Sequence, residues 1–205
     1  MEKVKKGHWE TVYQTKDTTK VGWFQPVPHV SIELIVDLNL SKKASIIDVG
    51  GGDSLLVDWF LDQEYEYVTL LDISESALQK AQNRLGPSAS KVTWEVSDIL
   101  EFEPQTEFDL WNDRAVFHFL TEPNEQQAYK SLVERAIASG GHLLVMTFSK
   151  SGPKSCSGLP VQQYDIVDLQ EFFSKEFEFV KGLNYDHITP SGSAQNYSVC
   201  LFRRR

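Results

Sequence analysis

The chain has 205 residues and a formal net charge of −9, from 20 basic and 29 acidic side chains. Hydrophobic residues make up 41% and charged residues 24%, which excludes a disordered chain and fits one soluble globular domain. An acidic surface repels phosphate backbones and anionic lipid, so neither nucleic acid nor a membrane is an expected partner. Within a single domain 1–205 we distinguish an N-terminal segment 1–40, a core 44–148 and a closing part 149–205.

The two cysteines, Cys156 and Cys200, provide neither a disulfide framework nor a metal cluster. No apolar stretch follows the first lysines, which argues against a signal peptide, and no run of about 18 apolar residues is present to span a membrane. We therefore expect a cytoplasmic protein without a metal site. The sequence does not predict its oligomeric state.

Short β-branched segments alternate with amphipathic segments through the core. The segments with strand character, in chain order, are 44–49, 67–71, 92–96, 108–111 and 142–148. The helices predicted between them by helical spacing are 54–62, 74–85 and 125–138, the last two ending at glycines. A helix over 165–175 then precedes two strands that only a loop connects, 177–183 and 196–202.

This alternation defines the expected fold class. Strand–helix–strand units cross over with a right hand and build a parallel sheet that helices cover on both faces. The final pair, joined by a loop alone, predicts an antiparallel strand at the end of the chain. The expected fold is therefore α/β and Rossmann-like: a doubly wound, mostly parallel seven-stranded sheet with an antiparallel C-terminal strand.

A glycine-rich loop, Gly50-Gly51-Gly52-Asp53-Ser54, follows the first predicted strand, which ends in Asp48-Val49. Glycines permit a sharp turn and a close approach of a ligand to the backbone, although turns of every kind use them. A dinucleotide fingerprint would need a further glycine where the chain has Leu55. The loop alone therefore indicates a ligand site without identifying the ligand.

Acidic side chains mark the ends of the first three predicted strands, at Asp48, Asp72 and Asp98. Asp72 lies roughly 20 residues beyond the glycine loop, the separation expected for a carboxylate that accepts hydrogen bonds from ribose hydroxyls. The alternative for Asp72 is a charge at the N-terminus of the helix that begins at Ser74. The three acidic ends face one crevice, and their local negative charge suits a cationic ligand.

The Asp-x-Gly-x-Gly form of Asp48–Gly52 and the acidic strand ends resemble class I S-adenosylmethionine-dependent methyltransferases over residues 44–148. Ser54 stands where many members carry a third glycine. The resemblance implies S-adenosylmethionine as the cofactor, with its methionine part over the glycine loop, its ribose at the second strand end and its adenine after the third. The cofactor residues it assigns in this core are Asp48, Gly50, Gly52, Asp72, Ile73, Asp98 and Ile99.

Two aromatic stretches near the N-terminus, Trp9-Glu10-x-x-Tyr13 and Gly22-Trp23-Phe24-Gln25, are similar to the N-terminal region of the thiopurine methyltransferase-like enzymes, which act on small thiols or metalloids. In that family a tryptophan-rich segment folds over the cofactor, which implies that Trp9, Tyr13 and Trp23 contact it. Aromatic faces attract a sulfonium cation, and a mobile lid excludes water. The alternative is an amphipathic helix packed on the edge of the sheet.

The segment 108–115 is similar to the Asp-Arg segment that borders the acceptor pocket in the same family. Methyl transfer depends mainly on aligning the nucleophile, the methyl group and the leaving sulfur, and a thiol is already partly thiolate at neutral pH. Arg114 is the candidate that orients an anionic acceptor, and Asp113 holds either Arg114 or the amino group of the cofactor. His118 is a candidate base or donor, or else a core histidine between two phenylalanines.

A loop rich in Gly, Pro and Ser follows the fifth predicted strand over residues 149–164. Long loops in compact domains are commonly functional, so Cys156 either lines the acceptor site or is a small loop residue without a role in it. His187, which precedes the last strand, either completes the acceptor pocket or belongs to a surface turn.

The expected function is methyl transfer from S-adenosylmethionine to a small-molecule nucleophile, with a thiol favoured. Methylation of protein lysine or of another nitrogen is the second hypothesis. Enzymes of that kind often carry Asn/Asp-Pro-Pro-Phe/Tyr where this chain has Asn112-Asp113-Arg114-Ala115. A non-catalytic S-adenosylmethionine-binding module is the third hypothesis, and an intact glycine loop and Asp72 cannot by themselves prove turnover. The fold does not fix the acceptor.

Overall fold

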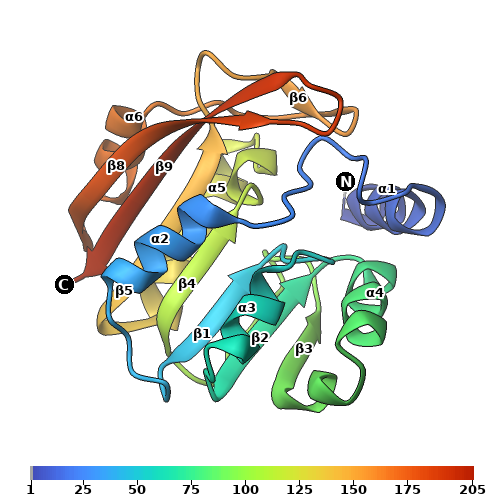
Figure 1. The fold of residues 1–205 in the computed structure, drawn as a ribbon. Helices are drawn as coiled ribbons and strands as arrows, with labels where there is room; N and C mark the ends of the chain where they lie inside the picture. Colours follow the sequence, from blue (N-terminus) through green and yellow to red (C-terminus); the bar gives the residue numbers. More distant parts are fainter. Residues whose placement is uncertain (1) are drawn as a thin grey trace.

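A seven-stranded sheet forms the centre of the molecule (Figure 1). The structure, a computed structural model, describes residues 2–205, with side chains from Lys5 onward. The strands are β1 Ser45–Val49, β2 Tyr67–Asp72, β3 Val92–Val96, β4 Phe108–Arg114, β5 Ile137–Phe148, β8 Phe177–Ile188 and β9 Ala194–Arg204. Their order is β3-β2-β1-β4-β5-β9-β8, in which β9 alone runs opposite to the other six strands. The predicted fold class is confirmed.

Helices cover both faces of this sheet. They are α1 Glu2–Thr15, α2 His29–Asp37, α3 Leu56–Asp62, α4 Glu75–Leu85, α5 Pro123–Ala136 and α6 Ile166–Phe173, with the 3-10 turns η1 Gly86–Lys91 and η2 Phe117–Phe119. Helices α2, α3 and α4 share one hydrophobic core with the sheet, and α5 and α6 share a second. Ile46 of β1 belongs to the first core and Ile47 to the second, which explains the continuous apolar sequence of this strand. In the described part of the chain, no helix has the length and apolar character needed to cross a bilayer.

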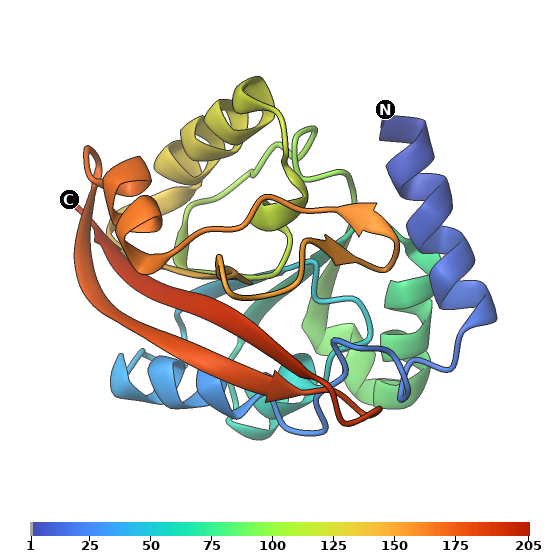
Figure 2. The same ribbon diagram turned by 90° about the horizontal axis from the view of Figure 1, so that it is seen from above.

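Helix α1 covers the edge of the sheet at which the parallel strands end, beside α4 (Figures 1 and 2). Glu10 of α1 accepts hydrogen bonds from Ser74 Oγ at 2.8 Å and from the Ser76 amide at 3.3 Å. A carboxylate at this helix start satisfies unpaired donors and complements the helix dipole. Although burial raises the pKa of Glu10, hydrogen bonds from Ser76 and Ser74 hold it below its ordinary value. The N-terminal segment is therefore a helix that also covers the strand ends.

The boundaries of β4 and β5 differ from those predicted. Strand β4 continues to Arg114, so the Asp-Arg pair belongs to the strand and does not follow it. The helix predicted over 125–138 ends at Ala136, and β5 begins directly at Ile137. Gly140, with a φ angle of +80°, lies inside β5, where the pairing with β4 shifts register. Glycine accommodates a strand irregularity here, whereas the sequence interpretation took it for a helix end.

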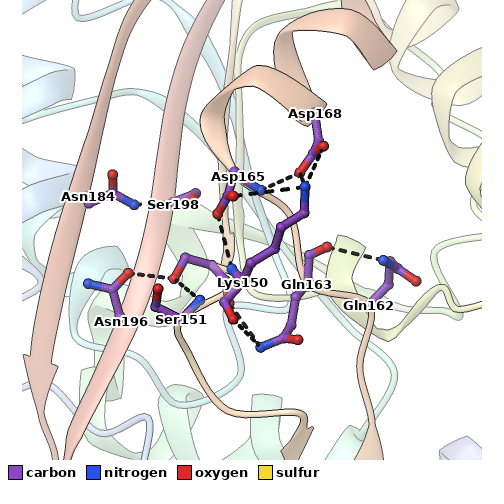
Figure 3. Close-up of polar contacts among 10 residues, drawn as sticks. Lys150, Ser151, Gln162, Gln163, Asp165, Asp168, Asn184, Asn196 and Ser198 are labelled. Carbon is purple, nitrogen blue, oxygen red and sulfur yellow. Dashed lines mark hydrogen bonds and ion pairs between the residues drawn. The ribbon is translucent and has the colours of Figure 1, made fainter.

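Polar contacts fix the loop that follows β5 (Figure 3). The Gln163 amide nitrogen donates to the Gly152 carbonyl oxygen at 2.7 Å. The Lys150 ammonium lies 2.6 Å from the Asp168 carboxylate in the first turn of α6. These contacts hold a small hairpin that lies above the same edge of the sheet as α1 (Figures 1 and 2). Its two strands are β6 Ser155–Cys156 and β7 Leu159–Pro160.

Gly152 has no room for a side chain, because an added Cβ would collide with the Asn196 carbonyl oxygen. Overpacking of this kind costs about 1–3 kcal/mol, so we expect Gly152→Ala to lower the free energy of unfolding by that amount. Urea denaturation measures the change. Gly7→Ala is the matched control, since nothing lies within 4 Å of its added Cβ, and alanine stabilises a helix. Equal stabilities of the two variants would contradict the tight packing of the loop.

Candidate active site

A cavity lies at the edge where the parallel strands end, beneath α1 and the segment that follows it. Its walls come from the glycine loop, from the ends of β2 and β4, from the residues after β3 and from the β6–β7 hairpin. Together with the open space at its mouth it encloses about 1130 Å³. Open parallel sheets bind their ligands at this edge.

The glycine loop exposes bare backbone to this cavity. Gly50 and Gly52 have φ angles of +64° and +53°, which favour glycine over other residues. A Cβ at Gly50 would collide with the Val116 side chain, and one at Gly52 with the Tyr13 hydroxyl. Gly50 and Gly51 line the cavity, whereas Gly52 faces Tyr13. The loop therefore needs glycine both for its backbone angles and for its close neighbours.

Asp72 ends β2 and lines the cavity. The side chain is buried, and it accepts a hydrogen bond from the Ser74 amide at 2.8 Å. Burial raises the pKa of Asp72 to about 7, and repulsion from Asp53 adds to this rise while the Ser74 amide opposes it. An additional hydroxyl donor in the cavity would therefore stabilise the ionised carboxylate.

Asp98 lines the neighbouring part of the cavity, together with Ile73 and Ile99. Its carboxylate accepts a hydrogen bond from the Leu100 amide at 3.0 Å, which fixes the turn after β3. This part of the cavity combines an acidic acceptor with two apolar walls. Of the three acidic strand ends predicted to face one crevice, those at Asp72 and Asp98 line this cavity, and Asp48 does not.

Asp48 lies under the glycine loop and does not line the cavity. One carboxylate oxygen accepts a hydrogen bond from the Asn112 side chain at 2.6 Å. The other is buried, and it has no hydrogen-bond partner among the described residues. Burial raises the pKa of Asp48 to about 6, although the Asn112 hydrogen bond and the Arg114 charge oppose the rise.

Asp113 points into the protein and braces the turn that follows β4. Its carboxylate accepts hydrogen bonds from the Tyr129 hydroxyl at 2.6 Å and from the Val116 amide at 2.8 Å. Burial raises its pKa to about 6 against the effect of these donors. The turn includes Ala115 at a φ angle of +72°, and both Ala115 and Val116 line the cavity. Asp113 therefore shapes the cavity wall without reaching the cavity itself.

Arg114 lines the cavity from the end of β4. Its guanidinium donates to the Trp23 carbonyl oxygen at 3.1 Å, which ties the N-terminal segment to the sheet. Within residues 5–205, no carboxylate lies within ion-pairing distance of it. A half-buried cation thus faces the cavity with only a neutral partner.

The two candidate histidines do not line the cavity. His118 is fully buried in η2, and its Nδ1 accepts a hydrogen bond from the Phe148 amide at 3.3 Å. Burial lowers the pKa of His118 to about 3, so the ring stays neutral. His187 lies in β8 and not in a surface turn, and its Nε2 donates to the Gly22 carbonyl oxygen at 2.9 Å. This hydrogen bond ties the N-terminal segment to β8, whereas the Arg114 bond ties it to β4.

Aromatic side chains of the N-terminal segment close the top of the cavity. The Trp9 ring lies 5.6 Å from the Trp23 ring and 5.3 Å from the Phe119 ring, between centroids. Tyr13 is buried beside them, and its pKa rises because of burial and of the nearby Asp72 carboxylate. Trp9, Tyr13 and Trp23 all line the cavity, so the structure brings these three predicted residues together with the strand ends.

The sequence interpretation missed several cavity residues. Asp53 belongs to the glycine loop and Phe119 follows the candidate base His118, so both stand in segments that the sequence marks as functional. Tyr197 lines the cavity from β9, where it pairs with Phe148, and no local motif marks it. Cys156, for which two interpretations were open, lines the cavity.

The fold and this cavity define the class as that of the class I S-adenosylmethionine-dependent methyltransferases. The chain belongs to the methyltransferase domain family, whose family model matches residues 40–190. S-adenosylmethionine is accordingly its cofactor, as the sequence predicted.

Known relatives act on different acceptors. The EEF1A lysine methyltransferase 2 of Danio rerio is 27% identical, over 96% of this chain and 84% of its own length. The thiocyanate methyltransferase 1 of Brassica oleracea is 28% identical, over 72% of this chain and 64% of its own length. The 1,6-didemethyltoxoflavin-N1-methyltransferase of Burkholderia thailandensis, solved with 1,6-didemethyltoxoflavin and S-adenosylhomocysteine, superposes with a TM-score of 0.74 at 18% identity, over 98% of this chain and 88% of its own. This last likeness concerns the fold.

The residues in the cavity fit S-adenosylmethionine chemically. Its ribose and adenine carry hydrogen-bond donors, for which Asp72 and Asp98 offer carboxylate acceptors. Its sulfonium is a cation, and the aromatic faces of Trp9 and Trp23 and the local negative charge favour a cation. The glycine loop has no side chains at Gly50 and Gly51, so the cofactor can approach its backbone closely.

Replacement of Asp72 is expected to raise the stability of the protein and to weaken cofactor binding. Because its raised pKa makes the ionised form costly in the fold, Asp72 contributes stability below about pH 4 that is lost as the pH rises through about 7. We expect Asp72→Asn to raise the free energy of unfolding of the cofactor-free protein by ~2 kcal/mol near pH 8, measured by urea denaturation.

The same variant should bind S-adenosylmethionine about 30- to 100-fold more weakly by calorimetry, because a charged hydrogen-bond acceptor is lost. The exposed Asp62→Asn is the matched control, with neither effect expected. Unchanged affinity in Asp72→Asn would contradict a role for this carboxylate in cofactor binding.

Proposed function

We propose that the protein transfers the methyl group of S-adenosylmethionine to a small anionic acceptor, a thiolate, yielding a thioether and S-adenosylhomocysteine. The observation that carries this proposal is Arg114, a cation at the cavity without a carboxylate partner among residues 5–205. Such a cation attracts an anionic acceptor and repels an ammonium group.

Each part of the cavity has a proposed role toward the cofactor. Asp72 accepts hydrogen bonds from the ribose hydroxyls, and Asp98 with Ile73 and Ile99 holds the adenine. The glycine loop lies against the methionine part, with the unpartnered oxygen of Asp48 beneath it. The residues proposed to cover the cofactor from above are Trp9, Tyr13 and Trp23. All of these except Asp48 and Gly52 line the cavity, which supports the assignment.

The chain's own residues explain how a thiol acceptor is activated. When bound, S-adenosylmethionine supplies an electrophilic methyl carbon. The Arg114 guanidinium stabilises a thiolate and so lowers the pKa of the acceptor thiol, which makes a protein base unnecessary. With the methyl donor held in the cavity, the thiol proton would leave to solvent, and the thiolate beside Arg114 would form the new S–CH₃ bond as the methyl–sulfonium bond breaks. The buried, neutral His118 fits a reaction that needs no base at this position.

Protein lysine methylation is the second candidate, and one observation favours it. The lysine methyltransferase relative matches nearly the whole chain, over 96% of its residues. Against it, Arg114 stands at the cavity, and Asn112-Asp113-Arg114-Ala115 replaces the Asn/Asp-Pro-Pro-Phe/Tyr motif expected of such enzymes. The thiocyanate methyltransferase relative agrees better with an anionic acceptor.

Labelled S-adenosylmethionine distinguishes these two candidates. The protein is incubated with the labelled cofactor and with separate panels of small thiols, amines and lysine-rich proteins, and the labelled products are identified by mass spectrometry. We expect label in thioethers. Label found only in protein would refute the thiol proposal.

Replacement of Arg114 tests the proposed role of its charge. We expect Arg114→Gln to lower kcat/KM for thiophenol by about 10- to 100-fold, since a charge-assisted contact is lost. The acidic limb of its pH–rate profile should move to higher pH, because the thiolate loses its stabilising cation. Arg114→Lys should keep part of the activity, and the exposed Arg135→Gln should keep all of it. An unchanged pH profile in Arg114→Gln would contradict the role.

A further inference from the structure

A second, more open groove adjoins the cavity. Its rim comes from residues 16–22 of the N-terminal segment, from Ser155–Ser157 at the β6–β7 hairpin and from Gln195. Trp23 and Cys156 line both the groove and the cavity, so these two side chains form the wall between them.

Arg114 lies directly behind this wall. Its guanidinium donates to the Trp23 carbonyl oxygen at 3.1 Å, and its charge acts on the Cys156 thiol. The groove therefore ends at a wall of two side chains, and the Arg114 cation lies on the other side of that wall.

We propose that this groove is the route by which the anionic acceptor reaches Arg114, and that the Cys156 side chain limits the size of the acceptor. The inference rests on the proposed function and adds to it an access route and a residue that determines specificity.

The geometry of methyl transfer supports a separate route. The nucleophile must approach the methyl carbon from the side opposite the leaving sulfur, so acceptor and cofactor occupy opposite ends of one line. Over the proposed cofactor end, α1 is fastened by Glu10 at the start of α4 and by Lys5, whose ammonium lies 3.0 Å from Glu125. The groove adjoins the cavity at Trp23 and Cys156, and the Arg114 guanidinium binds the Trp23 carbonyl oxygen there.

The charges on the rim suit an anion. Lys16 is exposed, and its charge acts on the Cys156 thiol; it forms no ion pair within residues 5–205. The Lys20 ammonium lies 3.3 Å from the Asp17 carboxylate, so this pair nearly cancels. Lys16 thus gives the rim a net positive charge that raises the local concentration of anions.

The hairpin that carries Cys156 is held in place by its flanking residues, and the Cys156 thiol is protonated at neutral pH. The Lys150–Asp168 ion pair (Figure 3) and the hydrogen bond from Gln163 to Gly152 stabilise the chain on either side of the hairpin. On the proposed route, the size of the side chain at this position sets the width of the opening between the groove and the cavity. Burial raises the pKa of Cys156 to about 11, against the effect of Arg114, so it remains a thiol at neutral pH and does not compete with the acceptor for the methyl group.

Changes in the size of residue 156 test the passage. Thiophenol and 2-naphthalenethiol carry the same nucleophile and differ by one fused ring. We expect Cys156→Leu to lower kcat/KM for thiophenol by about tenfold or more, and Cys156→Ala to raise the ratio of 2-naphthalenethiol to thiophenol turnover by about fivefold. Calorimetric affinity for S-adenosylmethionine should stay within about twofold of wild type in both variants, which shows that they fold and that the cofactor end is intact.

A charge reversal on the rim provides an independent test that leaves the wall in place. We expect Lys16→Glu to raise KM for thiophenolate by about threefold at low salt, with kcat unchanged and the difference fading as salt is added. Lys91→Glu makes the same charge change at the exposed end of η1, just before β3, and should leave KM unaltered.

The outcomes separate this inference from the proposed function. Suppose that the wild-type protein methylates thiols, but that both Cys156 variants keep the wild-type preference between the two thiols, or that Lys16→Glu and Lys91→Glu have the same KM. The access route is then overturned and the proposed function stands. If wild-type protein transfers label to no thiol, both are overturned.

Discussion

The burial of carboxylates at the edge where the parallel strands end is the constraint on which the rest of the structure depends. Asp48, Asp72 and Asp113 are nearly inaccessible to solvent, and burial raises the pKa of each. Buried charges persist only where donors surround them, and here backbone amides, Asn112 and Tyr129 supply those donors. The turn after β4 and the start of α4 are arranged around these carboxylates. The protein thus accepts a cost in stability to keep an acidic site in place.

The cavity is lined by charges of both signs. Asp53, Asp72 and Asp98 line it, and so does Arg114, which has no carboxylate within ion-pairing distance among residues 5–205. The acidic side chains behind the net charge of −9 are therefore not all on the solvated surface, because some of them line the cavity where a cationic methyl donor would bind. In the proposed function the carboxylates favour the cationic methyl donor and Arg114 favours the anionic acceptor.

Sequence patterns predicted the sheet and most of the cavity residues on its parallel strands, because the ends of parallel strands meet at one edge. Tyr197 was missed because β9 inserts between β5 and β8, a placement that depends on long-range pairing. His118 has the chemistry of a base, but packing against Phe148 decides that it is buried. Gly140 was misread because glycine serves helix ends and strand irregularities equally well. Local patterns locate the strands and the glycine loop, whereas exact boundaries and tertiary contacts depend on the rest of the fold.

A crystal structure of the protein with S-adenosylhomocysteine and thiophenolate bound together tests the division of the cavity most directly. We predict that the ribose hydroxyls contact Asp72 and that the thiolate sulfur lies beside the Arg114 guanidinium, within about the 4 Å of an ion pair. A ribose that binds away from Asp72, or a thiolate that binds away from Arg114, would contradict it.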